Sequence, residues 1–241
     1  MFVHVNSLRA PLCGALAGLL VLASLARADS VLVAPQFFSG ARTTPTGLGI
    51  NSTGNWKDQG VKIQWNITES SGIFTYQYTL STIAGGSLVG AVSHFILETS
   101  EAFTPGDILP GSNPVSGPQW WTPDMPSNPN MPAPIWGVKF DFGSGTPTYT
   151  LVTTKRPVWG DFYMKDGKAG RLGFNAAWNA GLAIGDPTLS ATDFTAWIPT
   201  PDTLAVVPPT VPLPAAAWMG LSLLGASTLV TYSRRRRACL G

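Results

Sequence analysis

The chain has 241 residues, of which 44% are hydrophobic and 12% are charged, about half of the charged fraction that is usual in a soluble domain. Six of the fifteen basic residues lie in the terminal segments, whereas all thirteen acidic residues lie from Asp29 to Asp202. The middle of the chain is therefore acidic, which excludes the basic surface that nucleic-acid binding requires. Both cysteines, Cys13 and Cys239, are also terminal, so the middle has no disulfide and no Cys-based zinc site.

Residues 1–28 are typical of a secretory signal peptide. Arg9 supplies the positive charge, Leu12–Leu25 is an apolar stretch, and Ala26 and Ala28 form the A-x-A pattern that signal peptidase accepts. We expect cleavage after Ala28. The alternative is an uncleaved membrane anchor, for which the apolar stretch is short.

The clearest structural pattern of the body, residues 29–198, is a pair of alternating runs. Apolar and polar residues alternate in Val61–Glu69 and again in Phe74–Leu80, which is the period of a half-buried strand. Ser and Gly between the two runs favour a turn. We therefore predict a β-hairpin here.

Other runs with strand character follow at short spacing, and no convincing helix interrupts them. They are Val31–Phe38, Ala91–Thr99, Ile135–Phe142, Thr148–Thr154, Val158–Met164, Arg171–Phe174 and Phe194–Ile198. Some eight or nine short strands bounded by Gly, Pro and Asn predict one antiparallel β-sandwich, either jelly-roll-like or immunoglobulin-like.

Two Pro-rich stretches do not fit this strand pattern. Residues 104–134 contain nine prolines, which cannot donate to a sheet ladder, so we expect a long surface excursion. Residues 199–210 are expected to form a semi-extended spacer.

Tryptophan is the residue type most in excess in the body. Trp65 lies on the apolar face of a predicted strand and is expected in the core. Trp120 and Trp121 lie in the Pro-rich loop and are expected to be partly exposed, where their indole faces would stack on sugar rings. The alternative is that most of these tryptophans cap a small core.

The catalytic inventory of the body is poor, so no enzyme, catalytic residue or cofactor is predicted. His94 is the only histidine in the body, and its strand pattern favours a packed residue over a base. No G-x-S-x-G elbow is present. Carboxylate pairs for glycoside hydrolysis have several candidates, and nothing distinguishes one pair: Glu69, Glu98, Glu101, Asp141 and Asp161.

Asp161 and Asp166 lie within one Gly-Asp-Phe-Tyr-Met-Lys-Asp-Gly segment, where a turn could bring their carboxylates together as calcium ligands. A hairpin turn at Asp166-Gly167 explains the same residues. We favour the turn and predict no metal.

The C-terminal segment, residues 211–241, has the order of parts of a sorting signal. A Pro-rich turn precedes an apolar span over 213–232, which is long enough for a membrane-crossing helix, and a basic cluster ends it. The residues of the turn and the cluster are Val211, Pro212, Leu213, Pro214, Arg234, Arg235, Arg236 and Arg237.

This tail resembles the PEP-CTERM sorting signals of Gram-negative bacteria, with Leu213 where the name-giving motif has Glu. The resemblance implies export across the inner membrane, processing by an exosortase, and a link to exopolysaccharide. Ser93–Glu98 and Pro157–Tyr163 are similar to β-sandwich modules of such proteins, which implies a fold and no activity. The alternative is an ordinary C-terminal anchor helix.

Two hypotheses of function follow from these observations. The first is a non-catalytic cell-surface or matrix protein that is associated with exopolysaccharide or biofilm, with signal peptidase and exosortase as its partners during export. The second is a secreted carbohydrate-binding or glycoside-hydrolysing module, for which Trp120 and Trp121 are the candidate contacts.

Overall fold

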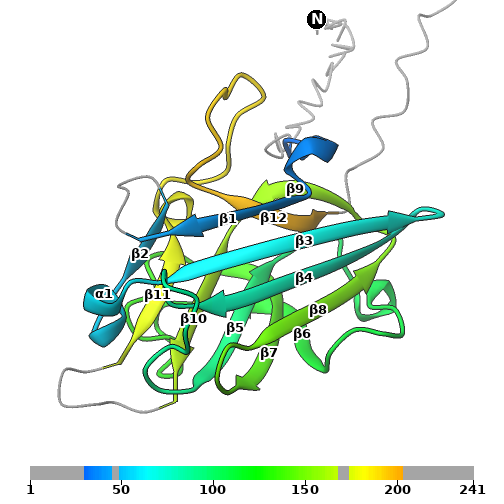
Figure 1. Cartoon of the computed structure of the whole chain (residues 1–241). Helices are drawn as coiled ribbons and strands as arrows, with labels where there is room; N and C mark the ends of the chain where they lie inside the picture. The colour runs from blue at the N-terminus through cyan, green and yellow to red at the C-terminus, as the bar shows by residue number, and fades with distance from the viewer. Residues whose placement is uncertain (1–29, 45–48, 168–173, 203–241) are drawn as a thin grey trace, which may run out of the picture.

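The computed structural model describes residues 30–44, 49–167 and 174–202, and strands dominate these ranges (Figure 1). The strands are β1 (Ser39–Thr43), β2 (Ile50–Ser52), β3 (Lys62–Ser70), β4 (Ile73–Ser81), β5 (Val92–Glu98), β6 (Val115–Trp121), β7 (Ile135–Gly143), β8 (Thr148–Thr153), β9 (Arg156–Gly160), β10 (Phe162–Asp166), β11 (Ala176–Asn179) and β12 (Ile198–Asp202). The helical elements are one short α-helix and three 3-10 turns: α1 (Asn55–Gln59), η1 (Pro35–Phe37), η2 (Pro105–Asp107) and η3 (Ala180–Ala183).

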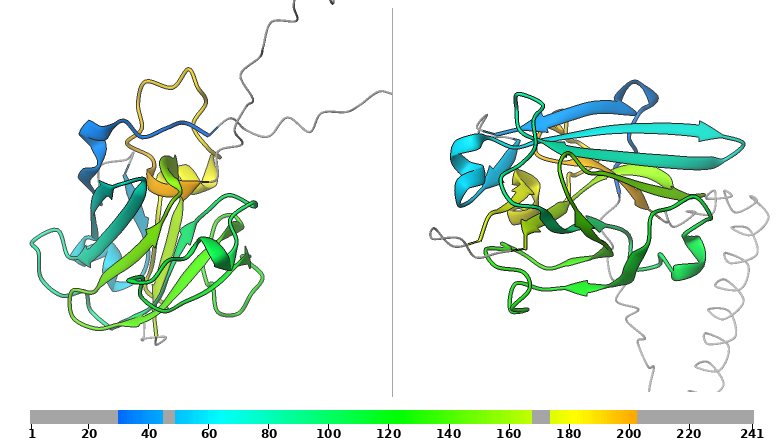
Figure 2. Two further views of the ribbon diagram at one scale, coloured as in Figure 1. Left: turned by 90° about the vertical axis from the view of Figure 1, so that its right-hand side faces the viewer. Right: turned by 60° about the horizontal axis from the view of Figure 1, so that its bottom comes forward.

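These strands form antiparallel sheets in two main layers. A four-stranded sheet has the order β1-β3-β4-β8, and a six-stranded sheet has the order β2-β11-β10-β5-β7-β6. A separate ribbon pairs β9 with β12. The two larger sheets lie one behind the other (Figures 1 and 2). The described part of the chain is therefore all-β and sandwich-like, as the sequence predicts.

The predicted hairpin is confirmed as β3 and β4. The two strands pair without interruption from Lys62 with Ser81 to Ser70 with Ile73. The turn residues Ser71 and Gly72 both have positive φ, 53° and 78°, as a tight hairpin turn requires.

The main core lies between the four-stranded and the six-stranded sheet. Tyr78 of β4 lies against Phe95 of β5, with ring centroids 5.6 Å apart. Phe95 in turn stacks on Tyr149 of β8 at 5.4 Å. Trp65 is 2% exposed, which confirms its predicted core position.

A second apolar cluster covers the opposite face of the six-stranded sheet. Along β5 and β10, Ile96 and Tyr163 belong to this second cluster, whereas their chain neighbours Phe95 and Phe162 belong to the main core, since successive side chains of a strand point to opposite faces. Met131 of the Pro-rich segment packs into the same cluster. The Pro-rich segment is thus the cover of this sheet face.

One correction concerns residues 104–134, which were expected to be a surface excursion without strand pairing. The segment contains β6, which pairs with β7 at the edge of the six-stranded sheet. Pro118 lies where the register shifts, between Ser116 and Gln119. An edge strand tolerates proline because the missing N–H need not serve a neighbour on its free side.

A second correction concerns the start of the expected spacer 199–210. Residues Pro199 to Asp202 belong to β12, pair with β9 and are buried. β12 lies at the edge of this two-stranded ribbon, and an edge strand again accommodates proline. The strand expected at Phe194–Ile198 therefore begins only at Ile198.

Two further runs are divided differently from the prediction. Val158–Met164 is not one strand: it breaks at Asp161, so that β9 lies in the ribbon and β10 in the six-stranded sheet. Val31–Phe38 contains an isolated bridge at Leu32 and the turn η1. The first regular strand of the described chain starts only afterwards, at Ser39.

Several predictions concern segments outside the described residues. These are the signal peptide with Ala26 and Ala28, the apolar span 213–232, the sorting motif with its Arg cluster 234–237, and most of Arg171–Phe174. Within the described ranges, no helix has the length and apolar character needed to cross a membrane.

Candidate functional site

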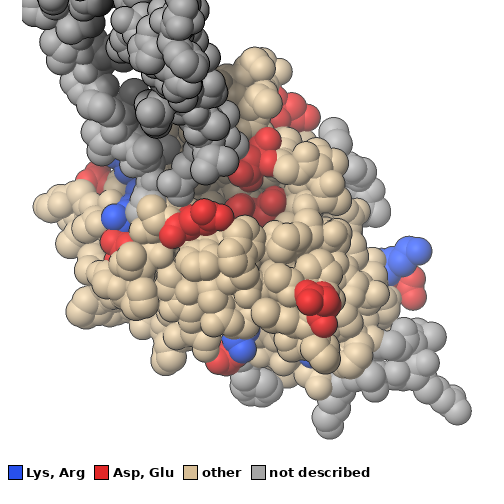
Figure 3. Space-filling view, turned by 180° about the vertical axis from the view of Figure 1, so that it is seen from behind, with Lys and Arg blue, Asp and Glu red and all other residues tan. Residues whose placement is uncertain are grey.

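A cleft of about 540 Å³ opens at one end of the six-stranded sheet, beside the β9–β12 ribbon. Its lining combines acidic, hydroxyl and aromatic side chains. These residues are Ser30, Glu98, Thr99, Ser100, Glu101, Trp120, Pro134, Trp136, Val158, Trp159, Asp186, Thr200 and Asp202. Figure 3 shows acidic side chains gathered around a hollow in the upper part of the face seen from behind.

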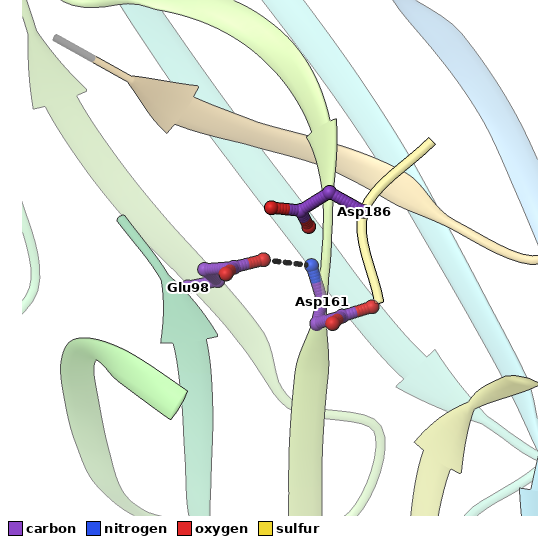
Figure 4. Close-up of side chains that lie close together, drawn as sticks. All are labelled: Glu98, Asp161 and Asp186. Carbon is purple, nitrogen blue, oxygen red and sulfur yellow. Dashed lines mark hydrogen bonds between the residues drawn. The ribbon is translucent and has the colours of Figure 1, made fainter. Parts of the chain in front are cut away.

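Three carboxylates from distant parts of the chain meet beside the cleft: Glu98 and Asp186 line it, and the buried Asp161 lies next to them. Glu98 ends β5, Asp161 lies at the break between β9 and β10, and Asp186 follows η3. One oxygen of each lies within 4.8 Å of the others (Figure 4). Asp161 stands here because the chain changes sheet at this residue, which brings the end of β9 and the start of β10 against the end of β5.

Backbone contacts hold Glu98 and Asp161 together. The Asp161 amide donates to Glu98 Oε2 at 2.6 Å, and the Glu98 amide donates to the Asp161 carbonyl at 3.0 Å. Gly160 makes this approach possible, because a Cβ at that position would lie 2.7 Å from Glu98 Oε2.

A buried asparagine fixes the Asp161 side chain. The Asn179 amide group donates to Asp161 Oδ1 and to the Ala196 carbonyl, while its oxygen accepts from the Phe162 amide at 2.7 Å. Asn179 is fully buried. The position of the Asp161 carboxylate is thus determined by the fold before any ligand arrives.

The electrostatics of this group favour uptake of positive charge. Burial raises the pKa of Asp161 to about 7; the Asn179 hydrogen bond opposes this shift and the Asp186 charge adds to it. Burial, and then the charges of Asp161, Asp186 and Asp202, raise the pKa of Glu98 well above its usual range. Burial and the Asp202 charge also raise the pKa of Asp186. Each shift reports a carboxylate whose negative charge is poorly compensated by the protein.

Three polar atoms on the cleft wall have no hydrogen-bond partner among the described residues. They are Thr99 Oγ1, the Trp136 indole nitrogen Nε1 and Asp202 Oδ1, all of them buried atoms. A buried polar group without a partner costs about 1–3 kcal/mol. Native proteins rarely leave such groups unsatisfied, but all three atoms are inaccessible to solvent, so a ligand in the cleft would reach them only after a side-chain movement.

Trp120 supplies an accessible aromatic surface at the same cleft. It is 46% exposed and packs edge-on against Trp136, with ring centroids 5.7 Å apart and planes at 71°. Its partial exposure agrees with the prediction. The two rings are not coplanar, so they do not form the flat double platform of an extended sugar-binding groove.

Trp121 corrects the prediction that both loop tryptophans are exposed. It is 6% exposed, belongs to the second apolar cluster, and donates its indole N–H to the Gly137 carbonyl at 2.9 Å. The reason is strand alternation: on β6, Trp120 and Trp121 point to opposite sides.

His94 lies away from this cleft, in the second apolar face. It is 4% exposed and lies beside Tyr163, with ring centroids 6.0 Å apart. Burial, assisted by the charges of Lys165 and Lys139, lowers the pKa of His94 to about 4. The prediction of a packed histidine is confirmed, although its Nε2 finds no partner among the described side chains.

Of the other acidic candidates of the sequence, Glu101 lines the cleft with Glu98, whereas Glu69, Asp141 and Asp166 do not. Glu69 accepts from the Gly72 amide in the hairpin turn, and Asp141 pairs with Lys139 at 2.8 Å. Asp166 accepts from the side chain of Asn175 at 2.7 Å and is not part of the group formed by Glu98, Asp161 and Asp186, so the structure does not bring Asp161 and Asp166 together as a calcium site at these two residues would require.

Asp186 and Asp202 are the members of the site that sequence reasoning missed. Asp186 lies in a Gly-Asp-Pro loop with no motif around it, and Asp202 lay in the expected spacer. Comparison with protein-family models, with curated proteins and with solved structures finds no match to this chain.

Proposed function

We propose that the protein is an exported, non-catalytic binding protein whose cleft takes a carbohydrate. The observation that carries this proposal is the half-exposed Trp120, which lines the same cleft as the carboxylates of Glu98, Asp186 and Asp202. Ligand sites of this kind combine an apolar surface with a few placed polar groups.

A sugar ring matches this lining chemically. The C–H groups on one face of the ring pack against an indole face, and its hydroxyls both donate and accept hydrogen bonds. The carboxylates of Glu98 and Asp186 line the cleft and accept such hydrogen bonds.

The charge of the lining indicates the kind of sugar. Four carboxylates, Glu98, Glu101, Asp186 and Asp202, line the cleft, and no lysine or arginine is among its described lining residues. An anionic sugar would meet like charges there. We therefore expect neutral or amino-substituted sugars to bind better than uronic acids.

The experiment is a binding titration of the full chain against neutral, amino-substituted and uronic-acid oligosaccharides. Trp120→Ala is expected to weaken binding of the preferred class at least tenfold. Ile73→Ala serves as the matched control, because Ile73 is 41% exposed and lies in the hairpin outside the cleft. Unchanged affinity in Trp120→Ala, or equal losses in both variants, would exclude the cleft as the sugar site.

Glycoside hydrolysis is the second candidate, and one observation favours it. Glu98 and Asp161 are paired carboxylates, and retaining glycosidases hold two carboxyl groups about 5–5.5 Å apart. Binding is preferred because Asp161 is 5% exposed, and a nucleophile must reach the sugar's anomeric carbon. Hydrolysis of a bound oligosaccharide that is lost in Asp161→Asn would reverse this preference.

Export and sorting form the second half of the proposal. They are supported by the signal peptide pattern of residues 1–28 and the PEP-CTERM resemblance of 211–241, and they assign the protein to the cell surface or the exopolysaccharide matrix. A jelly-roll-like or immunoglobulin-like arrangement of the sandwich belongs to the same proposal.

The intact mass of the protein from its host tests this half. A chain that starts at Asp29 and ends near Pro212, with the C-terminal end changed when the exosortase is deleted, is the expected result. A mass that retains Arg234–Arg237 in both strains would make the tail a permanent anchor.

A further inference from the structure

The carboxylate group of the cleft has the spacing of a single-ion site. Oxygens of Glu98, Asp161 and Asp186 all lie within 4.8 Å of one another. Calcium takes oxygen ligands at about 2.3–2.6 Å, so two oxygens on opposite sides of one ion lie up to about 5 Å apart. Magnesium, at about 2.1 Å, allows only about 4 Å and demands a regular octahedron. The spacing allows calcium, and three protein carboxylates without a regular octahedron suit calcium better than magnesium, which usually keeps several waters.

A further carboxylate beside this group, that of Asp202, also has no positively charged partner among the described residues. Asp202 is 6% exposed, lines the same cleft, and its Oδ1 has no hydrogen-bond partner among the described residues. A carboxylate oxygen has no proton of its own to donate, so it needs an N–H, an O–H or a cation.

The basic residues of the described chain do not fill this need. The two ion pairs found within it join Lys139 to Asp141 and Lys155 to Asp107. Neither involves the cleft carboxylates. A buried charge in a protein is usually paired with an opposite charge or coordinates a metal ion. Since no ion pair is found for these carboxylates among the described residues, a metal ion is the remaining partner.

We propose that Glu98, Asp161 and Asp186 bind one calcium ion, and that the negative charge of Asp202, which lines the same cleft, adds to the attraction of the ion. The ion would be held entirely by hard oxygen ligands, as calcium prefers. The three ligands come from the end of β5, the β9–β10 junction and the loop after η3. Calcium would therefore join the β9–β12 ribbon to the six-stranded sheet. The inference does not depend on the proposed carbohydrate.

Thermal unfolding of the full chain, stripped with EDTA and then titrated with calcium chloride, tests the proposal. Saturable binding is expected to raise Tm by roughly 5–10 °C at a hundredfold excess over Kd. One ion per chain should be found by calorimetric titration. A smaller shift with magnesium chloride is expected at the same concentration.

Asp186→Asn is the main variant because Asp186 is exposed and its replacement leaves the buried contacts intact. It should weaken calcium binding at least tenfold, and Asp161→Asn should weaken it further. Asp58→Asn, on the exposed side of α1, should leave calcium affinity unchanged. Glu101→Gln, in the cleft but outside the three-carboxylate group, should change it less than threefold.

Three results would overturn the inference. They are the absence of any saturable Tm shift up to about 10 mM calcium, in the range of the weakest extracellular sites, an equal shift with magnesium, and a calcium shift that survives in Asp186→Asn and Asp161→Asn alike. All three are read without any sugar, so the inference can fail while carbohydrate binding stands.

Discussion

The main core and the acidic cleft are built on opposite principles. The β3–β4 hairpin brings its core residues together from one continuous stretch, residues 62–81, by strand alternation alone. The cleft and the carboxylate group beside it instead collect Glu98, Asp161, Asp186 and Asp202 from segments spread over about a hundred residues. The hairpin contacts are apolar and satisfied, whereas the cleft contacts are charged and uncompensated. Stability thus resides in the first region, and the capacity to bind resides in the second.

The same contrast occurs on a single strand of the sheet. Trp120 and Trp121 are neighbours on β6, yet Trp120 is 46% exposed at the cleft and Trp121 is 6% exposed in the second apolar cluster. The comparison of regions can therefore be tested with one residue type at adjacent positions.

The largest effect is expected from Trp121→Ala. Removing a buried tryptophan costs about 3–5 kcal/mol of unfolding free energy, and here it also leaves the Gly137 carbonyl without its indole donor. Trp120→Ala should cost no more than about 1 kcal/mol, the scale of its edge-on ring contact. Urea denaturation of both variants measures the difference, and equal costs would contradict the division between the two faces.

An acid-sensitive residue within the apolar part of the molecule gives the next largest effect. The folded-state pKa of His94 is about 4, below the usual 6.5 or so of an unfolded histidine. Between about pH 6.5 and pH 4 the unfolded state binds a proton at His94, whereas the folded state keeps this histidine neutral. The free energy of unfolding therefore falls by about 3 kcal/mol as the pH falls from 6.5 to 4. Lys165 and Lys139 increase the effect, and Asp141 opposes it.

His94→Leu isolates this contribution from the cleft carboxylates. Those groups have raised pKa values and so contribute in the opposite direction as the pH falls. The stability of His94→Leu relative to the unmodified protein should rise by about 3 kcal/mol between pH 7 and pH 4. The free energy of unfolding of both proteins is measured by denaturant titration at the two pH values. The same difference between the proteins at pH 7 and at pH 4 would show that His94 is not the acid-sensitive group.

The sequence predicts the first region well because its signal is local. The alternation in Val61–Glu69 and the Ser-Gly turn after it need no knowledge of the rest of the chain. The Pro-rich segments are harder, since proline marks either a loop or an edge strand, and only the position in the sheet decides between them. For that reason both β6 and the start of β12 were missed.

The cleft is only partly visible in the sequence. Glu98 ends an apolar run, and Asp161 is the one charge in Pro157–Met164, so a charge at the break of an apolar run was an available signal for both. Asp186 and Asp202 carry no such signal. Their role arises from the tertiary arrangement of loop and ribbon, which no local pattern encodes.

A smaller effect tests whether Pro199 belongs to the packed body. Tyr78 is fully buried and donates its hydroxyl to the Pro199 carbonyl at 2.7 Å. Tyr78→Phe should therefore cost about 1–3 kcal/mol. Tyr149→Phe is the matched control, because the Tyr149 hydroxyl is buried without a partner among the described residues, and its loss should be neutral or stabilising. Equal effects in thermal unfolding would contradict the β12 contact.

The smallest effect on the free energy of unfolding is expected from Glu98→Gln. This substitution should stabilise the protein, whereas substitutions in the main core should destabilise it. In EDTA at pH 8 the variant should be more stable by roughly 0.5–1 kcal/mol, the size of one partly screened charge interaction. The amide oxygen still accepts from the Asp161 backbone, while one negative charge leaves a crowded group. No such gain is available in the main core, where every truncation removes favourable contacts.

Calcium should reverse this order. A bound calcium ion stabilises the folded state of the unmodified protein. In Glu98→Gln the ion has one ligand fewer and binds more weakly. The variant, which is the more stable protein in EDTA, should therefore be the less stable one in calcium. Glu101→Gln, whose carboxylate lies outside the three-residue group, should show little change in either condition. A Glu98→Gln variant that is less stable already in EDTA would mean that the protein itself compensates these charges, and the contrast between core and cleft would then be one of position only.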